Sequence, residues 1–182
     1  EIILNIDSDH LDYFKDIDHI VSSFDHFAHL VPRSGTIIAY DANPFVNRVI
    51  QGLDNVITFG LNENCDYRAS DIRFNENGMP SFDVSHKGKF LERVQLSVPG
   101  EHNILNALAA FTCGHSLGVD PAVIKDTLES YHGTQRRFDI IGVTSKGVKI
   151  VDDYAHHPTE IKATLAASQN VPHNQLWCLF QP

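Results

Sequence analysis

The first sixty residues alternate between short β-branched runs and helical patterns, and this order restricts the possible fold more than any other feature. An amphipathic helix pattern begins at Ile17, with Asp16 as its expected N-cap, and a shorter helix pattern runs from Asn43-Pro44 to about Gly52. Strands that are joined through helices favour a parallel sheet. We therefore predict an α/β fold. The strand patterns cover residues 1–6, 36–40 and 56–59.

The pattern changes after residue 60. Asn-Gly and Lys-Gly turn signals separate three strand-like runs, which predicts an antiparallel meander that extends the sheet at its edge. A helix pattern follows over 102–117 and ends at Gly118, and Asp120-Pro121 starts another that continues through Tyr131. The three runs are residues 67–74, 81–86 and 90–98.

A second unit is expected after the break at Gly133-Thr134-Gln135. A new strand, strand, helix series begins at Phe138, and residues 176–180 show a further strand pattern. We place a domain boundary near Gln135, so that residues 1–135 and 136–182 belong to different domains. Because both ends of the chain lie within strand patterns, we interpret it as an internal piece of a longer protein.

The net charge argues against some classes of partner, and the cysteine content indicates the compartment. The formal net charge of −9 over 182 residues argues against nucleic acid and against an anionic membrane surface. No apolar run approaches the roughly 20 residues that span a bilayer. Three scattered cysteines, Cys65, Cys113 and Cys178, match neither zinc nor redox spacing and indicate a reducing compartment such as the cytoplasm.

Two polar clusters follow strand patterns directly. His10 lies between Asp9 and Asp12 after the first strand, a set that can hold a divalent ion. Residues 152–157 lie between the strand pattern at 148–151 and a helix that starts at Pro158, at the edge where α/β sheets bind ligands. In both places a solvated polar loop remains the alternative. The second cluster presents Asp153, Tyr154, His156 and His157.

A third group combines amides and a guanidinium. Asn103 and Asn106 are three residues apart near a helix start and share a face, and a carboxamide can pair with the edge of adenine. Arg137, at the predicted boundary, has a rigid fork that suits a phosphate. The alternatives are a helix cap with a surface amide, and a solvated hinge charge.

Four motifs, taken together and in order, resemble the Mur ligase family over essentially the whole chain. They are Asp-His-Leu-Asp at 9–12, the run from Pro99 to Ala110, Gln-Arg-Arg-Phe at 135–138 and Asp-Asp-Tyr-Ala-His-His-Pro-Thr-Glu-Ile at 152–161. The resemblance implies the latter half of a central ATPase domain, with a mainly parallel sheet and an antiparallel extension, followed by the start of a Rossmann-like C-terminal domain. The Tyr-Ala-His-His-Pro-Thr-Glu form is similar to the branch that joins L-alanine to UDP-N-acetylmuramate.

The resemblance also implies an activity and residue roles. The family forms an amide through an acyl phosphate made with ATP and Mg²⁺, a step of peptidoglycan synthesis. His10 resembles the family's magnesium-binding histidine, Asn103 and Asn106 its adenine-binding asparagines, Arg137 its boundary arginine and Asp153 its ribose-binding acid. No catalytic residue is assigned within the chain. Further residues expected in the nucleotide or substrate cleft are His102, Tyr154, His156 and His157.

The chain departs from the family in two respects. It contains no Gly-x-x-x-x-Gly-Lys-Ser/Thr, since Gly88-Lys89 belongs to a hairpin turn, so we expect the phosphate loop upstream of Glu1. No lysine occurs between Lys15 and Lys87, so the carbamylated lysine that some relatives use is not assumed. By itself the piece is expected to be inactive.

Two other functions remain open at this point. One is a metal-dependent hydrolase, in which residues of both predicted domains would be ligands of one ion. The other is a non-catalytic nucleotide-binding relative. The hydrolase would use His10, Asp12, Asp153, His156 and His157.

Overall fold

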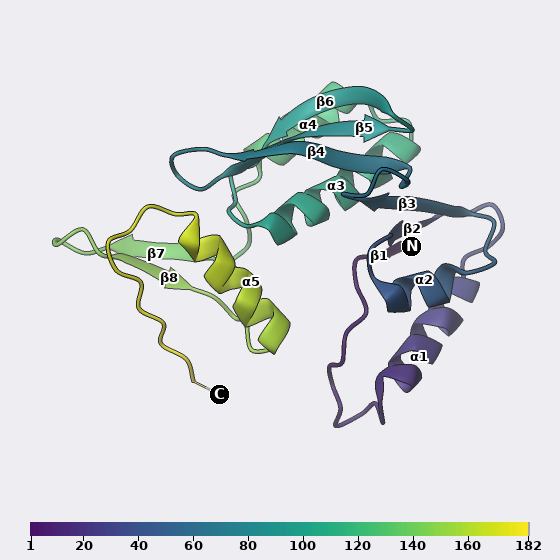
Figure 1. The fold of residues 1–182 in the computed structure, drawn as a ribbon, viewed down its shortest axis with the longest axis horizontal. Helices are drawn as coiled ribbons and strands as arrows, with labels where there is room; N and C mark the ends of the chain where they lie inside the picture. The colour runs from purple at the N-terminus through teal and green to yellow at the C-terminus, as the bar shows by residue number, and fades with distance from the viewer. Residues whose placement is uncertain (182) are drawn as a thin grey trace.

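The computed structural model describes residues 1–181 and contains a six-stranded and a two-stranded sheet (Figure 1). The strand order of the larger sheet is β1-β2-β3-β4-β5-β6. Its pairs are parallel from β1 to β4 and antiparallel from β4 to β6. The predicted parallel sheet with an antiparallel extension is therefore confirmed. The strands are β1 (Ile2–Ile3), β2 (Ile37–Tyr40), β3 (Val56–Gly60), β4 (Tyr67–Phe74), β5 (Pro80–His86) and β6 (Lys89–Gln95).

Four helices cover this sheet, two on each face. Alternate residues of β2 enter different clusters of buried side chains: Ile37 and Ala39 pack with α1 and α2, whereas Ile38 packs with α3 and α4. Because successive side chains of a strand point to opposite faces, the two clusters lie on opposite sides of the sheet. The helices are α1 (Ile17–His29), α2 (Pro44–Ile50), α3 (Glu101–Ser116) and α4 (Pro121–Ser130).

Local sequence signals account for the element ends. The Asp16 carboxylate accepts a hydrogen bond from the backbone N–H of His19 and caps α1, as predicted. The Lys87-Gly88 turn has φ of +49° and +77°, the left-handed conformations that a two-residue hairpin loop requires. It joins β5 to β6 at the predicted position.

The second sheet pairs β7 (Asp139–Val143) with β8 (Lys149–Asp152) in antiparallel fashion, and α5 (Pro158–Gln169) follows. Most side chains of residues 136–181 are exposed or half-buried, and Ala167 is the one fully buried residue of that range. We call residues 1–130 the six-stranded part and residues 136–181 the two-stranded part.

The C-terminal half of α5 is seated on the six-stranded part. A Cβ on Gly78, in the turn between β4 and β5, would collide with the carbonyl oxygen of Asn170. A Cβ on Gly100, at the start of α3, would lie 3.1 Å from the Cβ of Ala167. Glycine therefore permits the close approach of α5 at both places.

Two predicted strands differ in the structure. The expected strand over 1–6 is regular only at Ile2–Ile3. The expected strand at 176–180 is wrong: these residues are irregular, with Trp177 83% and Leu179 100% exposed. A strand needs a neighbour to pair with its N–H and C=O groups, and no strand of residues 1–181 pairs with this segment. None of the helices described has the length and apolar character to cross a membrane.

Candidate functional site

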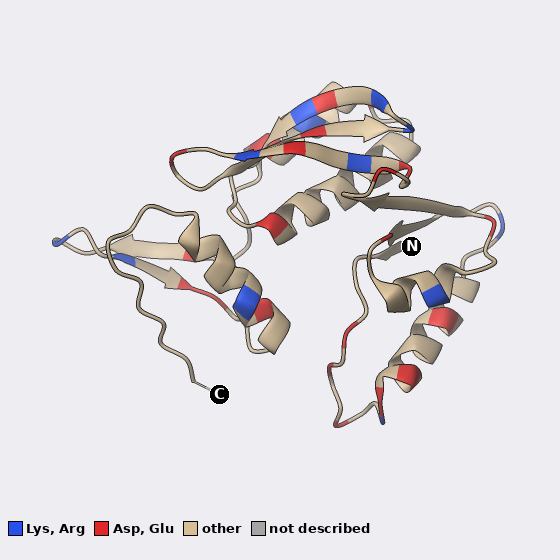
Figure 2. Ribbon diagram, in the orientation of Figure 1, with Lys and Arg blue, Asp and Glu red and all other residues tan. Residues whose placement is uncertain are grey.

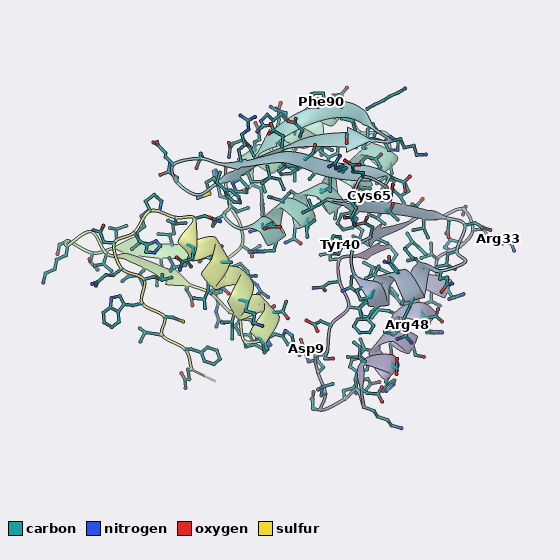
Figure 3. The ribbon with its side chains drawn as sticks, in the orientation of Figure 1. Asp9, Arg33, Tyr40, Arg48, Cys65 and Phe90 are labelled. Atoms are coloured by element: carbon teal, nitrogen blue, oxygen red, sulfur yellow. The ribbon has the colours of Figure 1, made fainter. Side chains whose placement is uncertain are left out.

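The loop after β1 carries His10 and a row of acidic residues (Figure 2). His10 has a φ of +52°, and its carbonyl accepts hydrogen bonds of 2.9 Å from the N–H groups of both Tyr13 and Phe14. The imidazole Nε2 lies 3.7 Å from Oδ2 of Asp9, whose side chain extends from this loop (Figure 3). The structure thus places His10 beside its sequence neighbour Asp9 in the loop that follows β1. A metal-binding role for His10 stays a prediction.

The start of α3 presents the two predicted asparagines on one face. Nδ2 of Asn103 donates to the carbonyl of Pro99 at 2.7 Å, and Nδ2 of Asn106 donates to Oδ1 of Asn103 at 3.3 Å. Gly100, not Asn103, is the N-cap of α3, so the capping alternative for Asn103 is wrong. The side chain of Asn106 is exposed, and beyond its hydrogen bond to Asn103 its amide keeps a second N–H and its carbonyl oxygen.

The pKa of His102, one residue before Asn103, depends on charged residues of the two-stranded part. Partial desolvation lowers the pKa of His102; the nearby charge of Asp153 opposes this shift and that of Arg137 adds to it. Residues at the α3 start, at the 136–138 segment and after β8 are therefore electrostatic neighbours. The resemblance to the Mur ligase family implied that all three belong to one cleft, and their roles there stay predictions.

Asp153 is held rigidly at the end of β8. Its Oδ2 accepts from the N–H of Phe138 at 2.9 Å and its Oδ1 from the N–H of Ala155 at 2.7 Å. Each carboxylate oxygen keeps a further lone pair for a ligand hydroxyl. Beside it, the ring of Tyr154 lies 4.6 Å from the guanidinium carbon of Arg136, a cation–π contact that orients the tyrosine.

Glu160 joins Arg137 to His156; it is part of the motif at 152–161, but no site role was predicted for it. Arg137 Nη1 donates to Glu160 Oε1 at 3.2 Å, and the N–H of His156 donates to Oε2 at 3.3 Å. Partial burial would raise the pKa of Glu160, but the hydrogen bonds from His156 and Arg137 lower it overall. Glu160 stands three residues after the N-cap His157, the position of a capping-box glutamate, which was the available signal.

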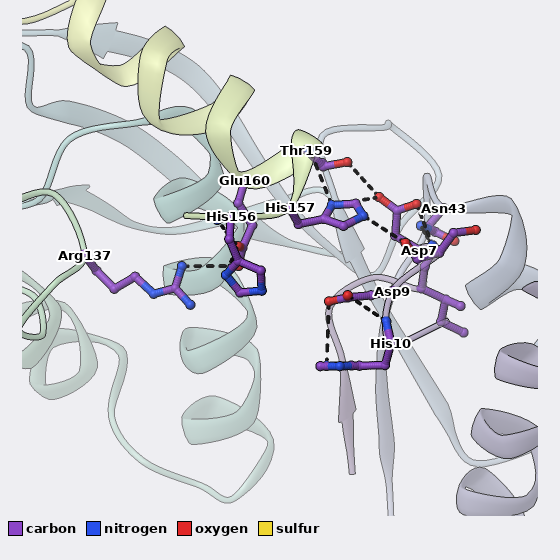
Figure 4. Close-up of polar contacts among 11 residues, drawn as sticks. Asp7, Asp9, His10, Asn43, Arg137, His156, His157, Thr159 and Glu160 are labelled. Carbon is purple, nitrogen blue, oxygen red and sulfur yellow. Dashed lines mark hydrogen bonds and ion pairs between the residues drawn. The ribbon is translucent and has the colours of Figure 1, made fainter. Parts of the chain in front are cut away.

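His157 and Thr159 contact the loop after β1 (Figure 4). Nε2 of His157 lies 2.8 Å from the carbonyl oxygen of Ser8, and the Thr159 hydroxyl donates to Oδ2 of Asp7 at 2.8 Å. The hydrogen bond from Thr159 is the largest influence that holds the pKa of Asp7 below its usual range. These contacts place the His10 loop next to the start of α5.

The described residues do not form a metal centre with several protein ligands. Within residues 1–181 no three His, Cys, Asp or Glu side chains gather in a way that holds a metal ion. The five-ligand centre of the hydrolase alternative, which included Asp12, is therefore not formed. Mg²⁺ takes one or two carboxylates and fills its remaining positions with water and substrate phosphates, and Asp9 supplies one carboxylate beside His10.

Family models match most of the chain. Residues 1–114 match the Mur ligase middle domain, and residues 136–182 match the Mur ligase glutamate ligase domain. Among solved structures, MurF from Acinetobacter baumannii superimposes with a TM-score of 0.82 at 25% identity, over 94% of this chain and 37% of that one. The UDP-N-acetylmuramate-alanine ligase of Thermotoga maritima superimposes with a TM-score of 0.77 at 29% identity, over 93% of this chain and 38% of that one.

Curated relatives are more similar in sequence. The chain is 50% identical over 182 residues to the UDP-N-acetylmuramate–L-alanine ligase of Caldanaerobacter subterraneus and covers 39% of that protein. Identity and coverage are the same for the protein of that name from Clostridium acetobutylicum. The chain thus spans about two fifths of the length of these relatives, with coverage of 39% in both. It belongs to the Mur ligase family.

Proposed function

We propose that the full-length protein containing this chain joins L-alanine to UDP-N-acetylmuramate with ATP, as a step of peptidoglycan synthesis in the cytoplasm. The observation that carries this proposal is the 50% identity across all 182 residues to ligases of that name. The placement of the α3 start, the residue 136–138 segment and the loop after β8 next to one another supports it. In this scheme residues 1–135 belong to the central ATPase domain and residues 136–182 begin the C-terminal domain.

The reaction needs activation because a carboxylate is a poor electrophile. Transfer of the terminal phosphoryl group of ATP to the carboxylate of UDP-N-acetylmuramate would give an acyl phosphate, and the amine of L-alanine would then displace phosphate to form the amide. Bound Mg²⁺ would neutralise charge on the transferring phosphoryl group. Within this chain, His10 would be its ligand.

The remaining residues would bind and orient the nucleotide. Asn103 and Asn106 would pair with the adenine edge, because each amide offers a donor and an acceptor. Asp153, fixed by two backbone N–H groups, would accept hydrogen bonds from the ribose hydroxyls. Arg137, now paired with Glu160, keeps further N–H donors for a phosphate. The other residues proposed to line the cleft are His102, Tyr154, His156 and His157.

A phosphate-release assay on the full-length protein tests the proposed reaction. Release from ATP is expected only when UDP-N-acetylmuramate and L-alanine are both present. Release with other muropeptides, but not with this pair, would contradict the assignment to this branch of the family. Release from ATP without any acceptor would instead favour an ATPase activity.

The Asn106→Ala variant tests the adenine contact. Loss of one hydrogen bond to the base is expected to raise the KM for ATP about fivefold to tenfold, with little change in the KM for UDP-N-acetylmuramate. Asn64→Ala, at an exposed position between β3 and β4, is the matched control and is expected to change neither constant. An ATP KM that is equal in Asn106→Ala and wild type would refute the contact.

A further inference from the structure

The start of α5 and the loop after β1 are joined by two separate hydrogen bonds (Figure 4). One runs from His157 to the backbone of Ser8 and the other from the Thr159 hydroxyl to the Asp7 carboxylate, each 2.8 Å long. They connect residues 149 and 152 positions apart, one in the loop after β1 of the larger sheet and the other at the start of α5, after β8 of the smaller sheet. The His157 side chain is 20% exposed and that of Asp7 is 46% exposed.

One tautomer of His157 accounts for both hydrogen bonds of its ring. A carbonyl oxygen only accepts, so Nε2 must carry the proton that it donates to Ser8. Nδ1 is then an acceptor, and it receives the N–H of Thr159 at 3.3 Å as the N-cap of α5. The same ring therefore begins the helix and binds the loop.

The loop needs such support because His10 has a strained backbone. Non-glycine residues rarely adopt positive φ, and they keep it where the surrounding structure holds them. On the N-terminal side, buried Ile6 is bound through its carbonyl to Nδ2 of Asn43. Across residues 9–12 the described hydrogen bonds stay within the loop itself. Asp7 and Ser8 are thus the last anchored residues before His10.

We propose that His157 and Thr159 are positioning residues for the metal site: by binding Ser8 and Asp7 they set the loop that presents His10. The C-terminal half of α5 packs against Gly78 and Gly100 of the six-stranded part. Because the other end of the same helix binds Asp7 and Ser8, the position of the two-stranded part also affects the loop at residues 7–13. Productive metal binding then requires the docked arrangement. This inference rests on the function proposed above, because it takes His10 as the magnesium ligand.

Three variants of the full-length protein test the proposal. Thr159→Val keeps the shape of the side chain and removes the hydroxyl that binds Asp7. Thr159→Ser restores the hydroxyl. Thr164→Val makes the same chemical change one and a half turns further along α5, where no contact with the loop exists in the described residues.

The first readout is the dependence of the reaction on Mg²⁺. Thr159→Val is expected to raise the apparent KM for Mg²⁺ about fivefold, the loss expected for one hydrogen bond to a partly exposed carboxylate, while kcat at saturating Mg²⁺ stays near the wild-type value. Thr159→Ser and Thr164→Val are expected to behave like wild type. A lower kcat in Thr159→Val with an unchanged Mg²⁺ requirement would overturn the positioning role.

The second readout needs no activity. Hydrogen–deuterium exchange of the peptide covering residues 7–14 is expected to be faster in Thr159→Val than in wild type, with Thr159→Ser and Thr164→Val unchanged. Equal exchange in Thr159→Val and wild type overturns the contact, even in an active enzyme. A wild-type protein that releases no phosphate overturns the proposed function and the metal role with it, while the exchange comparison still decides the contact.

Discussion

The two parts of the molecule are stabilised in different ways. The six-stranded part has a cluster of buried side chains on each face of its sheet, whereas the two-stranded part contains a single fully buried residue, Ala167. That residue packs against Gly100 of the other part. The six-stranded part is therefore stabilised by its own core. The two-stranded part is positioned by the contacts of α5 and the residue after it with Gly78 and Gly100. Stability and docking should respond to different substitutions.

The largest expected effect is on the core of the six-stranded part. Phe82 on β5 is fully buried, so Phe82→Ala should lower the free energy of unfolding by about 3–5 kcal/mol through lost burial and a cavity. Ile141→Ala on β7, where the side chain is 63% exposed, should cost less than about 1 kcal/mol. Native-state hydrogen exchange in increasing urea gives both values. Similar losses at the two sites would show that the two parts do not differ in how far buried side chains stabilise them.

A pair of glycine substitutions separates docking from backbone strain. Gly78 and Gly88 both have a φ of +77°, so alanine at either costs about 1–2 kcal/mol for the left-handed backbone. A Cβ at Gly78 also collides with the Asn170 backbone, whereas at Gly88 it meets nothing within 4 Å. Gly78→Ala should therefore cost about 1–3 kcal/mol more.

This extra cost should appear as faster hydrogen exchange in the C-terminal half of α5 in Gly78→Ala and not in Gly88→Ala. Equal exchange of α5 in the two variants would show that its docking does not depend on the close approach of Asn170 to Gly78.

A smaller and more local effect is expected at His102, whose pKa depends on the contact between the two parts. Because partial desolvation lowers its pKa, the ring should titrate below the ordinary value of about 6.5 in an NMR experiment. The folded state favours the neutral ring, so stability is complete above pH 6.5 and declines as the pH falls from there towards the lowered pKa. A midpoint at or above 6.5 would contradict the desolvated placement.

Two variants identify the groups around His102. Asp153 raises its pKa and Arg137 lowers it, so Asp153→Asn should move the midpoint further down and Arg137→Gln should move it up. Neither substitution should shift the midpoint if the two parts do not meet in solution.

The smallest effect is expected at an ion pair on the surface of the six-stranded part. Nη1 of Arg48, on α2, lies 3.0 Å from Oδ1 of Asp18 on α1, and the two side chains are 54% and 71% exposed (Figure 3). Solvent screening limits such a pair, so Arg48→Ala should change the free energy of unfolding by less than about 0.5 kcal/mol. A urea denaturation curve that shifts by more than this would show that α1 and α2 depend on the pair.

Features governed by neighbouring residues were predictable from the sequence. The N-caps Asp16 and Asp120 accept hydrogen bonds from N–H groups two or three residues ahead, and both helix starts were predicted. The three-residue spacing of Asn103 and Asn106 likewise predicted that they share a helix face. Such features depend on contacts within one turn of the chain.

Features that depend on distant partners were not predictable in this way. Residues 176–180 have a strand-like composition, but a strand also requires a neighbouring strand, which no local pattern reveals. The contact between Asp7 and Thr159 spans 152 positions and has no local signal. Glu160 is a different case, since its capping-box position was visible in the sequence and its link to Arg137 was not.

The open β7–β8 sheet has a practical consequence for anyone who produces this polypeptide by itself. Each of its two strands has a free edge in residues 1–181, and Ile141, Val143 and Val148 are all more than half exposed. Free edges with apolar side chains are templates for pairing between molecules and hence for aggregation. Lys146 and Lys149, in the turn and at the start of β8, act as gatekeeper charges. Their replacement by neutral residues should make the polypeptide markedly less soluble.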